Sequence, residues 1–218
     1  MKRRVAAIFL SAFFFVSCQS SVFRGGGGII DPALLKAYRA IDESMNQKRS
    51  ALMFEGGDSV VDCKAYLTVS VEKAIVESVS NQAVKSEYLI CDALRLLSQT
   101  KRFTGSFDVS RMGADLRNAL DVRTFPNSLV RMADERSYTL AQLFPEQSYA
   151  TGAVVVYDAD DWFLGLKVVA VADINRNSIL DWIVQLTDES TVGNYRNYAT
   201  LVIYDPRAGE VLKAALYR

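Results

Sequence analysis

The fold is decided by residues 163–187, which read FLGLKVVAVADINRNSILDWIVQLT. An apolar run enters this stretch, a polar loop follows at residues 173–181, and a second apolar run begins at Trp182. Runs rich in valine, isoleucine and leucine on both sides of a turn-rich loop are typical of two paired β-strands. The stretch therefore predicts two neighbouring antiparallel strands.

Similar runs recur through the C-terminal part of the chain, separated by aspartate-, glycine- and asparagine-rich turns. They lie at about residues 153–157, 163–172, 182–187, 198–204 and 211–217. Short connections favour antiparallel neighbours, so the pattern predicts a β-meander of about five strands. Alternate apolar residues should form one buried face of this sheet, among them Leu164, Leu166, Val168, Ala170, Trp182, Val184 and Leu186.

The preceding part of the chain is mainly helical. Asp31 and Pro32 are a helix cap and a first helical residue, and apolar residues recur at helical spacing to about residue 48. Further helices are expected at about 81–99, 110–120 and 139–144. Residues 60–79 are ambiguous, because the alternation at 65–71 favours a strand and the residues after it look helical. The sequence thus predicts an α+β domain over 31–218, with the helices of 31–150 packed on one face of the sheet of 151–218.

Composition excludes several classes of function. The 218 residues include 25 basic and 25 acidic side chains, so the net charge gives no basic surplus for nucleic acid. There is no histidine, which excludes histidine-based catalytic triads and metal sites. Half of the residues are hydrophobic, which is enough for a substantial core.

The first residues carry a targeting pattern. Lys2, Arg3 and Arg4 are followed by an apolar run at 5–16, which is shorter than the roughly twenty residues of a membrane-spanning helix. The run ends in Phe15-Val16-Ser17-Cys18. This pattern resembles a bacterial lipoprotein signal. The resemblance implies a signal peptide at 1–17, a lipid on Cys18 and a periplasm-facing protein anchored in a membrane.

Two features that follow the anchor refine this expectation. Gln19 stands where aspartate would retain such a lipoprotein in the inner membrane, so the resemblance implies the outer membrane. Residues 18–30 are rich in serine and glycine, and we expect them to form a flexible tether.

The other two cysteines, Cys63 and Cys91, are expected to form a disulfide in an oxidising compartment. The alternative is a pair of buried free thiols, because cysteine is often a small core residue. A catalytic thiol is not expected, since no histidine is present to activate it.

The loop at 173–181 places side-chain oxygens at alternate positions, as calcium loops do. It resembles the loops of EF-hands, dockerins and FG-GAP repeats. The FG-GAP form fits better, because Val184 stands where an EF-hand has glutamate. The resemblance implies a weakly bound Ca²⁺, and the alternative is a hairpin loop that uses these residues for turn chemistry. The implied ligands are Asp173, Asn175, Asn177, Asp181 and the carbonyl of Ile179.

Three functions remain open from the sequence. The first is a non-enzymatic envelope lipoprotein that acts through contacts with a protein partner. The second is a periplasmic hydrolase that uses acidic residues at the other end of the sheet from the calcium-like loop. The third is a module that binds a small ligand between the helices and the sheet. The residues of that acidic end are Asp158, Asp160, Asp161, Asp188 and Glu189, with Tyr195 and Arg196 nearby.

Overall fold

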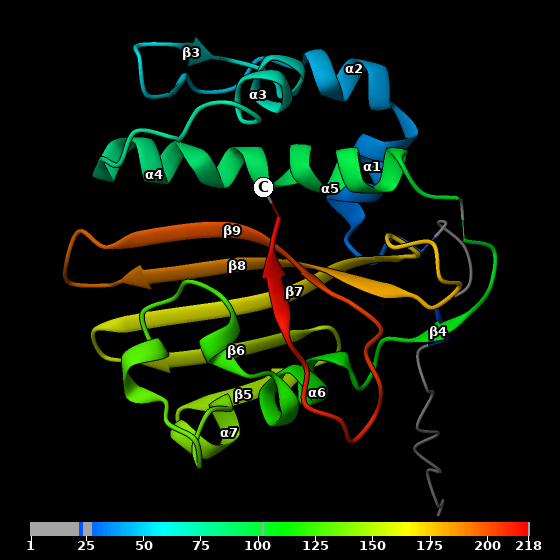
Figure 1. Ribbon diagram of the computed structural model, residues 1–218, viewed down its shortest axis with the longest axis vertical. Coiled ribbons are helices and arrows are strands. Elements are labelled where there is room, and N and C mark those ends of the chain that lie inside the picture. Colours follow the sequence, from blue (N-terminus) through cyan, green and yellow to red (C-terminus); the bar gives the residue numbers. More distant parts are fainter. Residues whose placement is uncertain (1–21, 24–27, 102, 218) are drawn as a thin grey trace, which may run out of the picture.

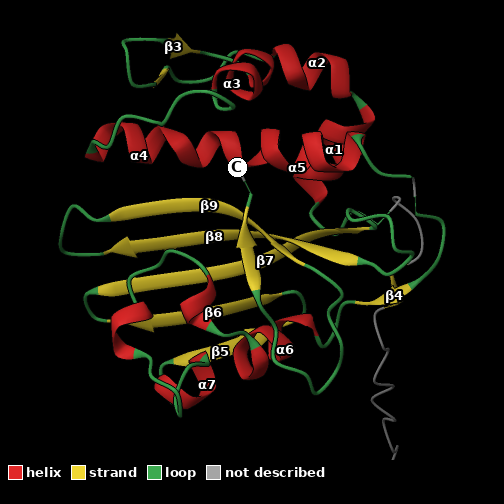
Figure 2. Cartoon of the chain, in the orientation of Figure 1, coloured by secondary structure: helices red, strands yellow, loops and turns green. Residues whose placement is uncertain are grey.

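The computed structural model describes residues 22–23, 28–101 and 103–217. It confirms an α+β fold with helices in the first part and an antiparallel sheet in the C-terminal half. Figures 1 and 2 show the helices in two groups, one beside β9 and one in front of β5 and β6. The helices are α1 (Pro32–Arg39), α2 (Ile41–Asn46), α3 (Cys63–Val69), α4 (Val79–Lys85), α5 (Leu89–Ser98), α6 (Met112–Ala119) and α7 (Leu140–Leu143), with 3₁₀ turns η1 (Ser86–Tyr88), η2 (Val122–Thr124) and η3 (Val130–Met132).

The main sheet has six strands in the order β10-β9-β8-β7-β6-β5. Each strand pairs with its neighbour in the sequence, which confirms the meander. The strands are β5 (Ser148–Thr151), β6 (Val154–Ala159), β7 (Trp162–Ala172), β8 (Asp181–Ser190), β9 (Arg196–Ile203) and β10 (Ala214–Leu216). The strand β5 was not expected, because it has only four residues and only Tyr149 and Thr151 among them have strong β preference. Two short pairs lie outside this sheet, β1 (Val22–Phe23) with β4 (Phe107–Asp108) and β2 (Leu52–Met53) with β3 (Ser59–Val60).

The central hairpin of β7 and β8 contains a bulge. Val168 pairs with Val184, but Ala170 pairs with Ile183, so the register shifts between Val168 and Ala170. A bulge moves the later side chains of a strand to the opposite face. Ala170 was expected to share the face of Leu166, and the structure corrects this: Ala170 packs in the core on the other side of the sheet.

Helical segments cover both faces of the sheet, so the expected single covered face is incomplete. The face that carries Leu166, Val184 and Leu201 packs against residues of the 107–144 segment, including Leu116 of α6 and Leu140 of α7. The opposite face packs against α1 and α5. Residues on this second face include Val169, Ile183 and Val202, which alternate with the first set along their strands.

Two glycines allow backbone to approach backbone where the layers meet. A Cβ on Gly113 of α6 would lie 2.2 Å from the carbonyl oxygen of Val154, and a Cβ on Gly28 would lie 2.2 Å from that of Val171. Gly28 also has a φ of +87°, which glycine adopts without strain. Its carbonyl accepts from the amide of Val171 at 2.8 Å.

The described residues of the expected tether at 18–30 belong to the folded domain. Val22 and Phe23 pair with β4, and Ile29 is fully buried. Gly28, beside Ile29, serves a close backbone approach. The rest of the expected tether, at 18–21 and 24–27, lies outside the described residues.

The segment expected as a strand at 65–71 is instead the helix α3. The side chain of Asp62 accepts from the amide of Ala65 at 2.8 Å and caps its first turn. Cys63, Tyr66 and Leu67 are buried on one side. The alternating apolar residues at 65, 67, 69 and 71 were misleading, because only Leu67 among them is buried and Val71 is 79% exposed.

A third core cluster joins α3 to α5 beyond the sheet. Cys63 and Cys91 form a disulfide, with Cα atoms 5.2 Å apart, which confirms the expected pair. Tyr88 is fully buried beside them, and its hydroxyl donates to the carbonyls of Ser50 and Val60. Within the described ranges, no helix combines the length and the apolar character needed to cross a membrane.

Candidate functional site

A cleft of about 650 Å³ lies between the helical layer of α3, α4 and α5 and the strands β9 and β10. Residues 70–77, which connect α3 to α4, form its rim, and Figure 1 places the C-terminal end of the chain beside it. Ligand sites are commonly concave, largely apolar and supplied with a few polar groups. The polar side chains that line this cleft include Tyr66, Lys85, Asp92, Thr200 and Tyr217. The other charged side chains that line it are Glu72, Lys73, Glu77 and Arg95.

Asp92 is the central group of the cleft. It follows Cys91 and precedes Ala93 and Leu94 on the buried side of α5, and only 6% of its surface is exposed. Burial raises the pKa of its carboxyl from 3.8 to about 6, although hydrogen bonding from Thr200 and Tyr66 and the charge of Lys85 oppose the rise. A carboxyl with a perturbed pKa inside a cleft is a candidate functional group.

Two hydroxyl groups flank this carboxyl. Tyr66 of α3 lies beside Asp92, and burial together with that neighbour raises the pKa of Tyr66. Thr200 of β9 is 1% exposed. Its hydroxyl lies close enough to lower the pKa of Asp92, yet it has no hydrogen-bond partner at normal distance and angle. Thr200 is therefore a buried polar group that can still form a hydrogen bond.

Lys85, the last residue of α4, brings a positive charge into the same cleft. Burial lowers the pKa of its ammonium, and the charges of Asp92 and Glu77 partly oppose this. Among the ion pairs found in the described chain, none within 4.0 Å involves Lys85 or Asp92. The cleft thus contains a buried carboxyl and a half-buried ammonium that do not neutralise each other by contact.

Covalent and hydrogen bonds fix the walls of the cleft. The disulfide connects α3 and α5 one turn before Tyr66 and next to Asp92. Asn81 of α4 is buried, and its amide donates to the carbonyl of Val76 at 2.7 Å. Its oxygen accepts from the amide of Met53 at 2.8 Å. These bonds hold the rim and the polar groups in place without a ligand.

The expected calcium loop is a tightly bonded turn. Asp173 accepts from the amides of Asn177 at 2.9 Å and Ser178 at 3.0 Å. Asp181 is fully buried and accepts from the amides of Ile174 at 2.8 Å and Asp205 at 2.9 Å. Both carboxylates thus help to hold the loop, as the turn-chemistry alternative requires.

The two expected amide ligands lie in the same loop and approach a third acidic residue. The Oδ1 atom of Asn177 accepts from the amide of Ile179 at 2.8 Å, and its Nδ2 donates to Asp205 at 2.7 Å. Asn175 accepts from the amide of Asn177 at 3.2 Å. In the described ranges, no three acidic or cysteine side chains gather as a metal-binding group. Calcium binding at this loop stays a prediction.

The acidic end of the sheet does not form one site. Asp188 is fully buried on the α6 side and accepts from the Ser128 hydroxyl at 2.7 Å, the Trp162 indole at 2.8 Å and the Tyr195 hydroxyl at 3.1 Å. Glu189 lies on the opposite face, where it pairs with Arg196 at 3.0 Å. Strand alternation separates these neighbours.

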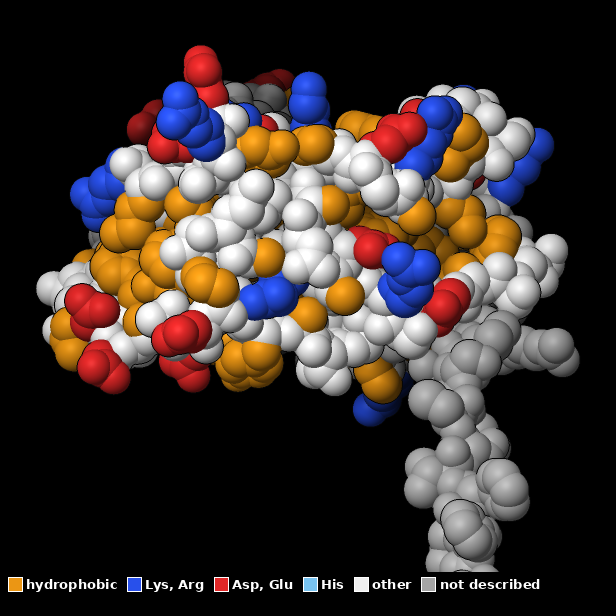
Figure 3. Space-filling model, turned by 90° about the horizontal axis from the view of Figure 1, so that it is seen from below, with side chains coloured by type: hydrophobic (Ala, Val, Ile, Leu, Met, Phe, Trp, Pro, Cys, Tyr) orange, Lys and Arg blue, Asp and Glu red, His pale blue; other side chains and the backbone are white. Residues whose placement is uncertain are grey.

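The remaining acidic residues of this end are exposed in or beside the β6–β7 turn, namely Asp158, Asp160 and Asp161. Figure 3 shows acidic side chains on the surface at the left, the end at which Figure 1 places this turn. Acid–base catalysis needs carboxyl groups that converge on one reacting bond. Together with the opposed Asp188 and Glu189, this geometry gives the hydrolase hypothesis no site at this end of the sheet.

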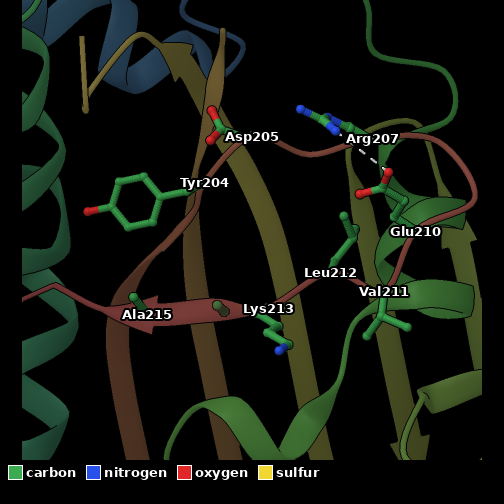
Figure 4. Close-up of a pocket in the computed structure, with 9 residues that line it drawn as sticks. Tyr204, Asp205, Arg207, Glu210, Val211, Leu212, Lys213 and Ala215 are labelled. Atoms are coloured by element: carbon green, nitrogen blue, oxygen red, sulfur yellow. Dashed lines mark ion pairs between the residues drawn. The ribbon is translucent and has the colours of Figure 1, made fainter. Parts of the chain in front are cut away.

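A second groove, of about 390 Å³, lies along the segment between β9 and β10. Figure 4 shows the ion pair of Arg207 and Glu210 beside it, with Tyr204 pointing away from that pair. Both charged side chains are more than half exposed, so their pairing adds little stability. The groove has no buried ionisable group, and it is a weaker candidate than the cleft at Asp92.

The third hypothesis from the sequence, a ligand site between the helices and the sheet, named none of the residues that line this cleft. One signal was present: Asp92 is a charged residue inside the apolar stripe of a helix. No signal connected it to Tyr66 or Thr200, which are far away in the sequence. The expected lipidation site at Cys18 lies outside the described residues.

The architecture is an α+β domain with a six-stranded antiparallel meander, both faces covered and a polar cleft at one edge. No protein-family model, curated protein or solved structure gives a significant match to this chain.

Proposed function

We propose that this protein is an envelope lipoprotein whose folded domain binds a small polar ligand, without catalysing a reaction, in the cleft at Asp92. The observation that carries the proposal is the cleft itself. It has a volume of about 650 Å³, and its lining includes Asp92, which is only 6% exposed. A buried carboxyl lowers stability unless a partner compensates its charge, so its presence in a cleft favours a role in ligand binding.

The proposed lipid anchor is supported by the N-terminal pattern of basic residues, an apolar run at 5–16 and the pair Ser17-Cys18. Cys18→Ala should block lipidation and release the domain from outer-membrane fractions. Labelling with a radioactive fatty acid tests this directly. Equal labelling of the variant and the wild type would exclude lipidation at Cys18.

Ligand binding can be tested with a variant that fills the cleft. Ala74 lines the cleft and is exposed, so Ala74→Trp should obstruct it without burdening the core. Ala114 is exposed on α6, which packs on the other face of the sheet, and Ala114→Trp is the matched control.

The full chain in detergent should be screened by thermal shift against amino acids, sugars, nucleosides and fatty acids. At least one class should raise the melting temperature of the wild type and the control but not of Ala74→Trp. No shift from any class, or a shift that survives in Ala74→Trp, would refute the proposal.

A protein partner is a second candidate function, favoured by apolar side chains on or next to the rim. Val71 is 79% exposed, Val79 47% and Val76 36%. Exposed apolar groups that lie close together can mark an interface. Crosslinking of the envelope protein should then give a specific adduct that Val71→Glu abolishes and Val192→Glu, at the β8–β9 turn, leaves intact.

A further inference from the structure

The proposed function leaves the chemical class of the ligand open. The charged groups of the cleft limit which classes of ligand fit. Lys85 and Asp92 lie seven residues apart in the helical run of α4, η1 and α5. Seven residues are about two turns, which places both on one side of the run about 10 Å apart at the backbone. Both line the cleft.

Neither charge has found a partner within the protein that neutralises it by contact. Lys73, another lysine of the cleft, pairs with Asp58. Arg95 also lines the cleft, is exposed, and forms no ion pair with Asp92 within 4.0 Å. Among the described residues, the acidic groups that act on Lys85 are Asp92 and Glu77, both at longer range. Buried charges without close partners are costly, and a ligand that brings the complementary charge removes that cost. A ligand with a single charge would satisfy one of the two groups and leave the other.

The spacing of the two groups fits the charges of an α-amino acid. Its ammonium and carboxylate are about 3 Å apart, and two charge-assisted hydrogen bonds of about 2.8 Å extend this span to about 8 Å. That span can bridge groups that start about 10 Å apart and whose side chains lean into the same cleft. The Thr200 hydroxyl beside Asp92 offers one more acceptor for the ammonium.

The rest of the cleft is suited to an apolar side chain. Leu67, Ile75 and Leu216 line it together with the polar groups. The volume of about 650 Å³ exceeds what the charged part of an amino acid needs. Burial of an apolar side chain there would add favourable free energy that the charged groups alone do not supply.

We infer that the cleft binds a zwitterion of the α-amino acid class with an apolar side chain, its ammonium on Asp92 and its carboxylate on Lys85. This inference rests on the proposed ligand-binding function. Asp92 and Thr200 hold the positive end, Lys85 holds the negative end, and Leu67, Ile75 and Leu216 surround the side chain.

Three probes that differ only in charge test this inference. They are L-leucine, which carries both charges, L-leucinamide, which keeps the ammonium, and N-acetyl-L-leucine, which keeps the carboxylate. Calorimetric titration into the full chain in detergent should give binding of leucine at least about tenfold tighter than of either blocked form, since each lost charge removes a charge-assisted hydrogen bond.

Two variants assign the ends of the ligand. Asp92→Asn should weaken leucine binding at least about tenfold and leave the binding of N-acetylleucine unchanged. Lys85→Met keeps the aliphatic stem of the lysine and should weaken leucine at least about tenfold while leaving leucinamide unchanged. Lys64→Met, at an exposed position of α3, is the matched control and should leave all three affinities unchanged.

The outcomes separate this inference from the function on which it rests. No binding of leucine, equal binding of leucine and a blocked form, or wild-type affinity in both cleft variants would overturn the zwitterion. If another class of compound then shifts the wild type but not Ala74→Trp, the ligand-binding function stands and only the ligand class is wrong. If no compound does so, both the zwitterion inference and the ligand-binding function are wrong.

Discussion

Replacing Asp92 with asparagine removes one ionisable group from the cleft while keeping the shape of the side chain. In the wild type, the folded protein favours the neutral carboxyl, because burial raises its pKa to about 6. The amide of asparagine is always neutral, has nearly the same size as the carboxyl, and keeps a hydrogen-bond acceptor beside the Tyr66 and Thr200 hydroxyls. The variant should therefore be more stable than the wild type where the wild-type carboxyl is charged.

The sign and size follow from the linkage between proton binding and folding. A carboxyl whose pKa is higher in the folded state than in the unfolded state contributes stability below its unfolded value and loses it as pH rises through the folded value. The rise from 3.8 to about 6 is roughly two pH units. At 1.36 kcal/mol per unit, the wild type should lose about 3 kcal/mol between pH 3.5 and pH 8 through this group.

Urea unfolding followed by tryptophan fluorescence measures this effect. The stability difference between Asp92→Asn and the wild type should be small at pH 3.5 and grow to about 3 kcal/mol in favour of the variant at pH 8. Asp121→Asn is an opposite control: hydrogen bonding from Arg123 holds the pKa of Asp121 below its ordinary value, so the stability of this variant relative to the wild type should fall as pH rises. A pH-independent difference for Asp92→Asn would refute the burial argument.

Three other outcomes are expected. Leu166→Ala should lower the free energy of unfolding by about 2–4 kcal/mol, because Leu166 is fully buried between the sheet and α6, and a loss below about 1 kcal/mol in urea unfolding would contradict this packing. Replacing Cys63 and Cys91 by alanine should cost about 3.5 kcal/mol for a sequence separation of 28, and unchanged thermal stability would show that the bond adds nothing. If the loop holds calcium with a dissociation constant of about 0.3 mM, 3 mM Ca²⁺ should add about 1.4 kcal/mol. Asp173→Ala should abolish the resulting rise in melting temperature. If calcium does not raise the melting temperature of the wild type, the loop is a turn that does not bind calcium.

The sequence predicted the sheet better than the layers around it. The long apolar runs of β7 and β8 flank a loop of turn-forming residues, so their pairing could be predicted locally. The bulge after Val168 could not, because every residue from 168 to 172 is apolar and either face would accept it. The same lack of alternation is the sequence feature that corresponds to the second covered face, because strands that are buried on both sides show continuous apolar runs.

The cleft was beyond local reasoning for a different reason. Its polar groups come from α3, α4, α5, β9 and the residue after β10, and their convergence depends on how the layers pack. The disulfide could be predicted because only two cysteines remained. Its position beside Tyr66 and Asp92 could not be predicted, since the pattern at 60–79 is ambiguous between strand and helix.

The order of elements along the chain has a consequence for how the protein folds during synthesis. A chain emerges from its N-terminus, and domains form as their parts become available. Here α1 and α5 appear well before β7, β8 and β9, the strands that bury their apolar faces. Cys63 and Cys91, however, are both present by then, and their bond needs no strand of the main sheet. Oxidation can therefore fasten α3 to α5 while the chain is still incomplete. The late meander, whose strands pair with their sequence neighbours, would then close rapidly onto a helical layer that is already assembled.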